Sequence, residues 1–273
     1  MLRCVPRGWQ WDETLYRGSA TYYRRGRLPY PSRLADACAT ALGLDGHGRL
    51  IDVGCGPGII ALLLAHWFDE VVGVDPDADM LAEAARAAQT QGAANVRWVH
   101  ARAEDLPPSL GPFRVATFAQ SFHWMDRERV TALMFEMLEP GGAFVQISGS
   151  TESALPVGAA LQTLVARYLG PERRAGQGVL RFGTPSDESA VLRAAGFGEP
   201  QILNVPGGEI VERSVDDMVA AVFANSARAP HLFGDRLEAF EAEVRSALWH
   251  ASPSGAFAEQ IGDTELRIWR TPV

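Results

Sequence analysis

Short apolar runs alternate with longer amphipathic stretches through the middle of the chain. Five runs have the length and composition of buried strands, at residues 49–53, 70–74, 96–100, 114–119 and 143–148. Three stretches between them have helical spacing, at residues 59–68, 78–91 and 126–138. Because strands that alternate with helices in this way are typical of βαβ units, the pattern predicts a mostly parallel sheet with helices on both faces.

The two ends of the chain follow a different pattern. Residues 1–30 are rich in arginine and aromatic side chains, which predicts an arm with one short helix that Pro29-Tyr30-Pro31 ends. A helix is expected next at residues 32–41, with Ser32 as its N-cap. Beyond Gly149, the pattern predicts helices at 155–169, 187–195, 215–227 and 235–249, a loop at 170–183, and strands at 201–205 and 265–270. These two strands would complete a sheet of seven, and the helices around them would form an inserted lid.

A glycine-rich turn joins the first predicted strand to the first predicted helix of the alternating region. It reads Gly54-Cys55-Gly56-Pro57-Gly58, and glycine is needed where a backbone bends sharply or touches a ligand. The helix that follows presents free N–H groups at its start. Asp75 ends the next strand, where a carboxylate can accept hydrogen bonds from both hydroxyls of a ribose. Together these features predict a nucleoside-containing ligand.

The spacing of the glycines separates two classes of nucleoside ligand. A dinucleotide fingerprint, G-x-G-x-x-G, would place its third glycine at position 59, which is Ile59, whereas Gly58 gives G-x-G-x-G. Asp52 lies just before the turn among apolar neighbours, so its carboxylate must meet donors from the backbone or from a ligand. A structural turn that binds no ligand is the alternative.

Composition excludes several kinds of enzyme. The chain has 273 residues and 25 basic side chains, all of which are arginine. Without lysine there is no Schiff-base or pyridoxal-phosphate chemistry, no P-loop or protein-kinase site, and no Tyr-x-x-x-Lys of a short-chain dehydrogenase. Three cysteines and six histidines show no metal-type spacing, so no metal is expected.

The charge is acidic and unevenly distributed. The net charge of −8 does not favour a nucleic-acid partner, and no segment resembles a signal peptide or a membrane span, so a cytoplasmic protein is expected. The first 50 residues hold eight arginines and four acids, a balance of +4, so the rest carries −12. Either the arm lies on an acidic body, or one of its arginines meets an anionic group of a ligand.

Five motifs in order resemble those of class I S-adenosylmethionine-dependent methyltransferases. Residues 51–58 resemble the first motif, Asp75 the ribose-binding acid, and Ala103-Glu104-Asp105-Leu106-Pro107 the segment that contacts adenine. Gln120-Ser121-Phe122-His123-Trp124 is similar to the segment after strand four in the methyltransferase-11, or trans-aconitate-methyltransferase-like, branch. Residues 138–142 resemble the turn before strand five. The resemblance implies a Rossmann-like fold of seven strands that uses S-adenosylmethionine.

The resemblance also implies roles for individual residues. Residues that it places at the cofactor are Arg27, Tyr23, Gly54, Cys55, Gly56, Gly58, Asp75, Pro76, Ala103, Glu104 and Gln120. Among them Arg27 belongs to Arg27-Leu28-Pro29-Tyr30-Pro31, which is similar to an Arg-Pro-x-Tyr-Pro unit, and would meet the cofactor carboxylate. The chain departs from the pattern at Arg102 and Arg114, where many relatives carry aspartate.

Methyl transfer needs two partners held at attack distance with water excluded. Tyr22, His123 and Trp124 are the residues expected at the acceptor. His123 is the candidate general base, or else it packs beside Trp124, which is itself either a wall of the site or part of the core. The acidic body and the lid favour a small acceptor, methylated on O, N or C. The alternatives are a nicotinamide-dependent oxidoreductase and a methyltransferase that acts on RNA or protein; a non-catalytic nucleoside-binding protein is a further one.

The expected organisation follows from these assignments. An N-terminal arm and helix over the cofactor site would cover residues 1–45, and the cofactor-binding core residues 46–150. The lid would comprise residues 151–183 and 206–262. Residues 184–205 and 263–273 would supply the remainder of the sheet. The oligomeric state stays open.

Overall fold

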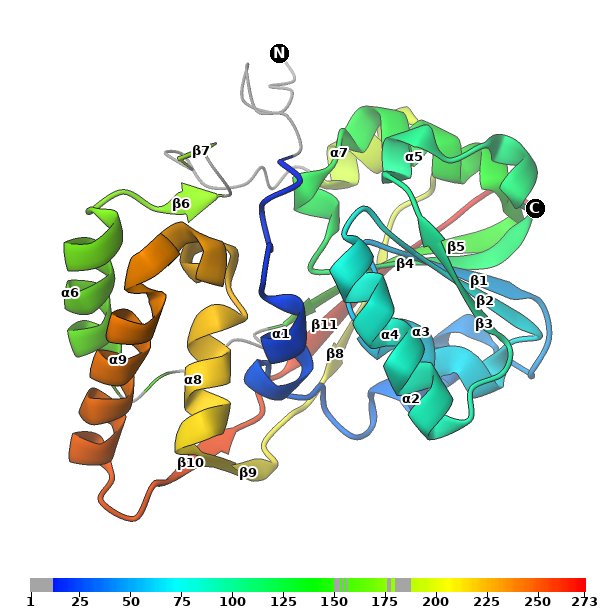
Figure 1. The fold of residues 1–273 in the computed structure, drawn as a ribbon. Coiled ribbons are helices and arrows are strands. Elements are labelled where there is room, and N and C mark those ends of the chain that lie inside the picture. The colour runs from blue at the N-terminus through cyan, green and yellow to red at the C-terminus, as the bar shows by residue number, and fades with distance from the viewer. Residues whose placement is uncertain (1–11, 150–152, 154, 156, 176–177, 180–187) are drawn as a thin grey trace.

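A seven-stranded sheet forms the centre of the molecule (Figure 1). The computed structural model describes residues 12–149, 153, 155, 157–175, 178–179 and 188–273. The strand order is β3-β2-β1-β4-β5-β11-β8. The strands are β1 (Arg49–Val53), β2 (Glu70–Asp75), β3 (Val96–His100), β4 (Phe113–Ala119), β5 (Leu138–Gly149), β8 (Gln201–Val205) and β11 (Thr264–Arg270). Within this sheet β11 pairs antiparallel with β5 and with β8, and every other pair of strands is parallel. The prediction of a seven-stranded, mostly parallel sheet is confirmed.

Helices cover both faces of this sheet. The helices are α2 (Leu34–Leu42), α3 (Ile59–Leu64), α4 (Ala78–Gln91), α5 (Arg127–Met137) and α7 (Glu188–Ala194). Leu50 points to the cluster that holds α2 and α3, whereas its neighbour Ile51 points to the cluster that holds α5 and α7. Successive side chains of a strand alternate between faces, so a strand buried on both sides is apolar throughout. This is why the strands were recognisable as continuous apolar runs.

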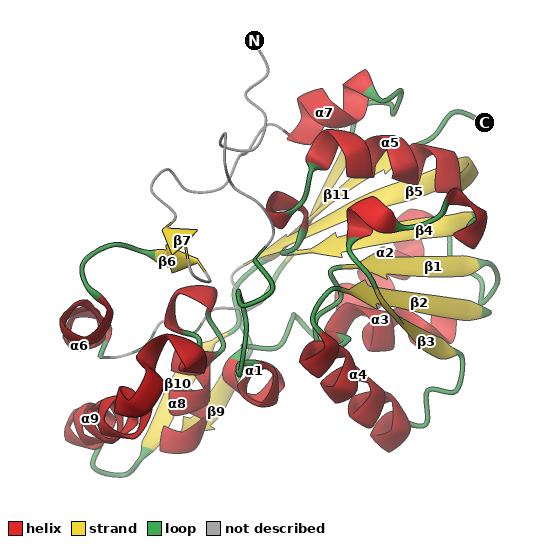
Figure 2. Ribbon diagram, turned by 45° about the horizontal axis from the view of Figure 1, so that its top comes forward, coloured by secondary structure: helices red, strands yellow, loops and turns green. Residues whose placement is uncertain are grey.

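A second layer lies beside the sheet and has an apolar core of its own (Figure 2). It contains α6 (Gly158–Leu169), α8 (Val215–Phe223), α9 (Leu237–Ala251) and a hairpin of β9 (Ile210–Ser214) with β10 (Ala256–Gln260). We call these five elements the lid. Its core includes Met218, Phe223 and Phe240. Phe233, from the 3-10 segment Pro230–Arg236 before α9, stacks on Phe240 with the ring centroids 4.0 Å apart.

The N-terminal arm lies between the lid and the sheet (Figure 1). Its helix α1 (Ala20–Gly26) packs on α8, and the Ser19 hydroxyl donates to the Phe223 carbonyl at 2.8 Å in a buried contact. On the other side, the Arg24 guanidinium donates to the Pro57 carbonyl of the glycine turn at 2.9 Å. The arm therefore links the lid to the first loop of the sheet.

Several local expectations were wrong. Ser32 does not cap α2, which begins at Leu34; the Ser32 hydroxyl donates instead to Glu209 at 2.7 Å. The helix expected at 215–227 ends at Phe223, and short 3-10 turns follow it. The segment expected as a loop at 170–183 contains the short strands β6 (Arg174–Ala175) and β7 (Gly178–Val179) within its described part. The hairpin of β9 and β10 was not expected.

Two further expectations concern the termini and membranes. The first eleven residues of the expected arm lie outside the described residues. In the described part of the chain, no helix is both long and apolar enough to cross a membrane.

One indole ring fills the space above two glycines, and this arrangement can be tested. A Cβ placed on Gly73 would lie 2.3 Å from the Trp98 ring, and one on Gly58 would lie 2.5 Å from it. We expect Gly73→Ala to lower the free energy of unfolding by about 1–3 kcal/mol, because the added methyl overpacks the ring. Urea unfolding measures the change. In a Trp98→Ala background the same substitution should cost much less, and an equal cost in both backgrounds would contradict this packing.

Candidate active site

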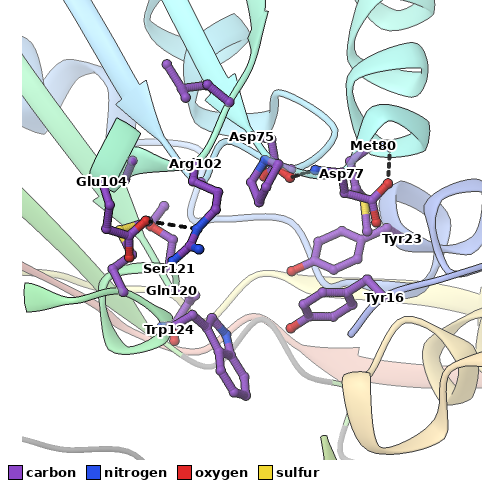
Figure 3. A pocket seen from close by; sticks show the side chains of 18 residues that line it. Tyr16, Tyr23, Asp75, Asp77, Met80, Arg102, Glu104, Gln120, Ser121 and Trp124 are labelled. Carbon is purple, nitrogen blue, oxygen red and sulfur yellow. Dashed lines mark hydrogen bonds and ion pairs between the residues drawn. The ribbon is translucent and has the colours of Figure 1, made fainter. Parts of the chain in front are cut away.

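A pocket opens at the carboxyl ends of β1, β2 and β4 (Figure 3). It encloses about 720 Å³, part of which is open to solvent. Its lining residues are Tyr16, Tyr23, Gly54, Gly56, Val74, Asp75, Pro76, Asp77, Met80, Ala101, Arg102, Ala103, Glu104, Ala119, Gln120, Ser121, Trp124 and Met125. In doubly wound sheets this edge is where ligands bind.

A second pocket of about 440 Å³ adjoins the first. The two share Tyr23, Gly54, Gly56, Ala119 and Gln120 in their walls. The second is completed by Arg27, Tyr30, Asp52, Cys55, Pro57, Ile59 and Ile60. The arm and the glycine turn therefore meet around it.

The glycine turn needs its glycines for two different reasons. Gly54 has a φ of +67°, and a Cβ there would lie 2.5 Å from the Cβ of Ser121, so the position allows no side chain. Gly56 has a φ of +51°, and no atom lies within 4 Å of where its Cβ would stand. Because Gly56 lines both pockets, that empty space is room for a ligand against the backbone.

Asp75 connects the end of β2 to this turn. Its Oδ2 accepts the Gly56 N–H at 2.8 Å, and its Oδ1 accepts the Asp77 N–H at 2.9 Å. The side chain is buried in the pocket wall, and desolvation raises the pKa of Asp75 to about 7. An ionised carboxylate has about four lone pairs, so roughly two remain to accept donors from a ligand.

Asp52 has a different task from Asp75, although both are buried. Its Oδ1 accepts the Thr117 hydroxyl at 2.8 Å, and its Oδ2 accepts the Ala61 N–H at 3.1 Å. Burial raises the pKa of Asp52 to about 6. Of the two kinds of donor expected for this carboxylate, backbone or ligand, the structure shows a backbone donor, and the contacts tie β1 to α3 and β4.

Helix α1 sends its two adjacent tyrosines in different directions. Tyr23 lines both pockets, and the Arg27 guanidinium lies over its ring at 4.9 Å from the centroid. Tyr22 packs against Phe223 of the lid at 5.1 Å, where burial raises the pKa of its hydroxyl. Successive residues of a helix differ by about 100° in direction. Tyr22, expected at the acceptor, lines neither pocket and packs half-buried against the lid core.

The opposite wall comes from the segments after β3 and β4 (Figure 3). Glu104 Oε1 accepts the Asp126 N–H at 2.9 Å, and its other oxygen lies 3.5 Å from the Arg102 Nε. Gln120 has a φ of +56°, a left-handed conformation that is uncommon for any residue except glycine. Its side-chain amide donates to the Gly149 carbonyl at 2.8 Å. Such strained positions concentrate at functional sites.

Besides Tyr22, two predicted site residues, Gly58 and His123, line neither pocket in the described part of the chain. Gly58 forms the start of α3 with a φ of +75° and packs against Trp98. His123 packs beside Trp124, with their rings 4.9 Å apart, and burial lowers the pKa of His123 to about 4. Trp124 itself lines the larger pocket.

The sequence interpretation also missed part of the lining. Tyr16, Met80, Arg102, Ser121 and Met125 all contribute to the larger pocket. Ser121 had a usable signal, since it follows Gln120 directly in a recognised motif. Tyr16 had none beyond its aromatic character in the arm, where its ring meets that of Tyr23 edge-on at 5.8 Å.

Comparison with known proteins shows what the residues of this site resemble. Residues 50–142 match a family model described as a methyltransferase domain, and this range contains the glycine turn, Asp75, Glu104 and Gln120. Residues 50–142 are thus similar to a methyltransferase domain, and curated relatives that are named methyltransferases match part of the chain. The more specific branch suggested by the sequence stays a prediction.

Curated relatives match part of this chain rather than the whole of it. An uncharacterized methyltransferase of Mycobacterium tuberculosis is 33% identical over 132 residues, which are 48% of this chain and 51% of that protein. The malonyl-(acyl-carrier protein) O-methyltransferase of Enterobacter lignolyticus is 35% identical over 114 residues, 40% of this chain and 42% of that protein. The chain thus spans about half, or less, of the length of these relatives.

The likeness in fold extends beyond the methyltransferase domain. A solved structure from Anaeromyxobacter dehalogenans, described provisionally as a type II methyltransferase, superimposes with a TM-score of 0.53 at 25% identity. The superposition covers 90% of this chain and 99% of that one. The Rossmann-like fold class expected from the sequence is confirmed.

The environment of Asp75 predicts an unusual titration. In the free protein, a ¹³C NMR titration of the carboxyl groups should contain an aspartate with a pKa near 7, because burial disfavours its charged form. Asp75→Asn should remove that signal. If every aspartate titrates below pH 5, the described burial of Asp75 is wrong.

Proposed function

We propose that the protein transfers the methyl group of S-adenosylmethionine to a small-molecule acceptor. One observation carries the proposal: the glycine turn and the Asp75 carboxylate meet in one pocket, with the Gly56 N–H 2.8 Å from Oδ2. A nucleoside that approaches Gly56 is thereby brought to the carboxylate. The fingerprint G-x-G-x-G favours S-adenosylmethionine over a dinucleotide.

The described residues fit each part of that cofactor. The unused lone pairs of Asp75 suit the two ribose hydroxyls. Pro76, Met80 and Ala103 offer the larger pocket an apolar wall for the adenine. Arg27 stands in the adjoining pocket, where its guanidinium suits the carboxylate of the methionine part.

The shared wall of the two pockets is the natural place for the reacting centre. A cofactor with its adenosine in the larger pocket and its carboxylate in the smaller one must pass its sulfur between them. Tyr23 and Gln120 line both pockets and would flank that sulfur. The cofactor supplies a methyl group already activated on a positive sulfonium, so the protein has to orient the partners and exclude water.

Aromatic side chains favour an apolar or aromatic acceptor. Tyr16, Tyr23 and Trp124 line the larger pocket together, and Figure 3 shows the two tyrosines side by side. Such faces stack on planar acceptors and also attract a positive sulfonium.

Calorimetry with S-adenosylmethionine and with NAD tests the cofactor assignment. The protein should bind the first and give no heat with NAD. Asp75→Ala should abolish measurable binding, whereas Asp79→Asn, an exposed change on α4 outside the pocket, should leave it unchanged. Heat with NAD alone would overturn the proposal.

The pKa of Asp75 adds a pH dependence to that binding. Ribose hydroxyls donate to the ionised carboxylate, so binding lowers the pKa of Asp75 from about 7 and releases a proton near neutral pH. Affinity should therefore fall as the pH drops below 7, by up to about tenfold per unit. Calorimetry in two buffers of different ionisation enthalpy counts the proton.

The role of His123 is open to a separate test. A general base contributes about 10²–10⁴ in rate. Because His123 packs beside Trp124 away from the pocket lining, we expect His123→Gln to lower kcat less than about tenfold and to leave the pH profile unchanged. A loss of about a hundredfold with an altered profile would restore His123 as the base.

A further inference from the structure

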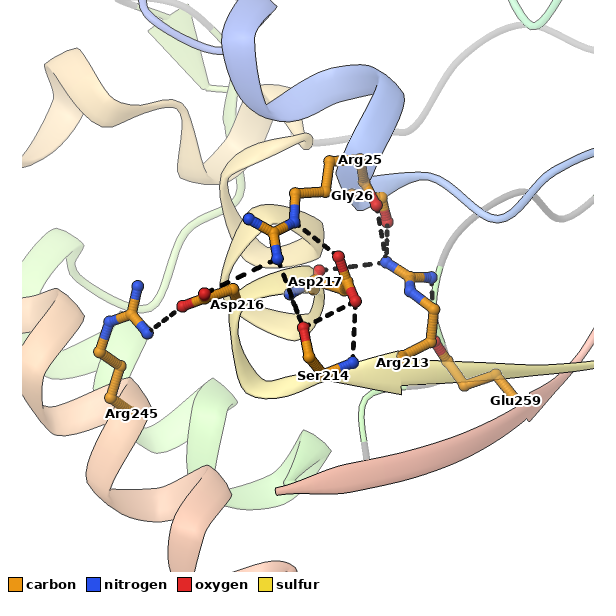
Figure 4. A network of polar contacts seen from close by, with 8 residues as sticks. All are labelled: Arg25, Gly26, Arg213, Ser214, Asp216, Asp217, Arg245 and Glu259. Carbon is orange, nitrogen blue, oxygen red and sulfur yellow. Dashed lines mark hydrogen bonds and ion pairs between the residues drawn. The ribbon is translucent and has the colours of Figure 1, made fainter. Parts of the chain in front are cut away.

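A buried arginine of the lid contacts the helix that carries the cofactor-facing residues of the arm (Figure 4). Arg213, on β9, donates from its Nη2 to the carbonyls of Arg25 at 2.9 Å and Gly26 at 3.1 Å. These carbonyls belong to the last turn of α1, where backbone acceptors have no partner within the helix. Arg213 therefore caps α1, although it lies 188 positions from Arg25 and 187 positions from Gly26 in the sequence.

This arginine is itself held firmly. Its Nη1 donates to Glu259 of β10 at 3.2 Å, and both side chains are more than nine-tenths buried. Glu259 also accepts the Ser153 hydroxyl at 2.6 Å. The guanidinium donates in addition to the Asp217 carbonyl at 3.1 Å. A buried charge that is paired and held by several hydrogen bonds in this way keeps one orientation.

A close backbone approach and a side-chain hydrogen bond also join the end of α1 to the lid. Gly26 approaches α8 so closely that a Cβ would lie 2.3 Å from the Ala220 carbonyl oxygen. The Arg25 side chain donates to Asp217 at 2.6 Å, and Asp217 forms the capping box of α8 with Ser214. The last turn of α1 is thus joined to α8 by close backbone packing and by a side-chain hydrogen bond, and Figure 4 shows the Arg25 and Asp217 side chains that form this bond.

The residue after this contact is Arg27. The Gly26 carbonyl lies in the same planar peptide unit as the Arg27 nitrogen, so fixing that oxygen fixes the direction in which the chain enters Arg27. There the backbone leaves the helix with φ −79° and ψ 143°, and the guanidinium reaches over Tyr23 into the smaller pocket. The carbonyl that Arg213 holds is one peptide bond from the side chain that faces the cofactor.

From these contacts we infer that Arg213 is a positioning residue for the carboxylate end of the cofactor, acting through Gly26 and Arg27. The lid thereby takes part in cofactor binding without touching the cofactor. The inference rests on the proposed function, because it takes S-adenosylmethionine as the ligand. Loss of the Arg213 contacts should therefore weaken binding of the cofactor carboxylate and leave binding of the adenosine part unchanged.

Two ligands separate these effects. S-adenosylhomocysteine carries the carboxylate, whereas 5′-methylthioadenosine has the same adenosine and sulfur without the amino-acid part. Arg213→Lys keeps a charge beside Glu259 but loses the planar fork that spans two carbonyls. We expect it to weaken binding of S-adenosylhomocysteine by about tenfold, as for a lost hydrogen bond to a charged group, and to change binding of 5′-methylthioadenosine less than twofold.

A double-mutant cycle tests whether Arg213 acts through Arg27. Arg27→Gln alone should weaken S-adenosylhomocysteine selectively, and adding Arg213→Lys to it should cost nothing more. The matched control is Arg245→Gln, which removes a partly exposed arginine that pairs with Asp216 and Glu241 and makes none of the contacts of Arg213 with the α1 carbonyls. It should leave both affinities unchanged.

Each outcome decides the inference. A parallel loss of both ligands, additive effects in the cycle, or no effect of Arg213→Lys would overturn it. If Arg213→Lys does not fold, as judged by thermal melting, Glu259→Gln takes its place and should show a smaller loss with the same selectivity. Failure of the wild-type protein to bind either ligand would instead contradict the proposed function.

Discussion

The hydrogen bond from the Gly56 N–H to the Asp75 carboxylate is the contact on which the site depends. It joins the loop after β1 to the end of β2, and so places a glycine without a side chain beside an anion. In the proposed function both parts are needed, because the turn supplies room for a nucleoside and the carboxylate supplies acceptors for its hydroxyls. The burial that raises the pKa of Asp75 also leaves it short of donors until a ligand brings them.

The sheet and the N-terminal arm position this contact from opposite sides. The sheet holds β1 and β2 in parallel register, so their carboxyl ends meet at one edge. The arm closes the other side, anchored to the lid by Ser19 and to the glycine turn by Arg24. A binding site placed between a rigid sheet and a separately packed lid can keep its cofactor side while the lid varies with the acceptor.

Sequence patterns identified what depends on local chemistry. The buried strands are apolar on both faces, and the glycine turn and Asp75 carry their geometry within a few residues. The sheet and the pocket wall that the turn and Asp75 form were therefore predictable. Contacts made across the chain were not. Tyr22 and Tyr23 are adjacent residues of the same type, so the sequence does not distinguish them. Only Tyr22 packs on Phe223 of the lid, a contact that the sequence does not reveal. The left-handed Gln120 and the pairing of β9 with β10 likewise depend on partners far along the chain.

A crystal structure with S-adenosylhomocysteine tests the central claim most directly. The account predicts both ribose hydroxyls within hydrogen-bond distance of the Asp75 carboxylate, the sulfur between Tyr23 and Gln120, and the carboxylate on Arg27. A ligand bound elsewhere, or a ribose turned away from Asp75 with the space beside Gly56 empty, would contradict it.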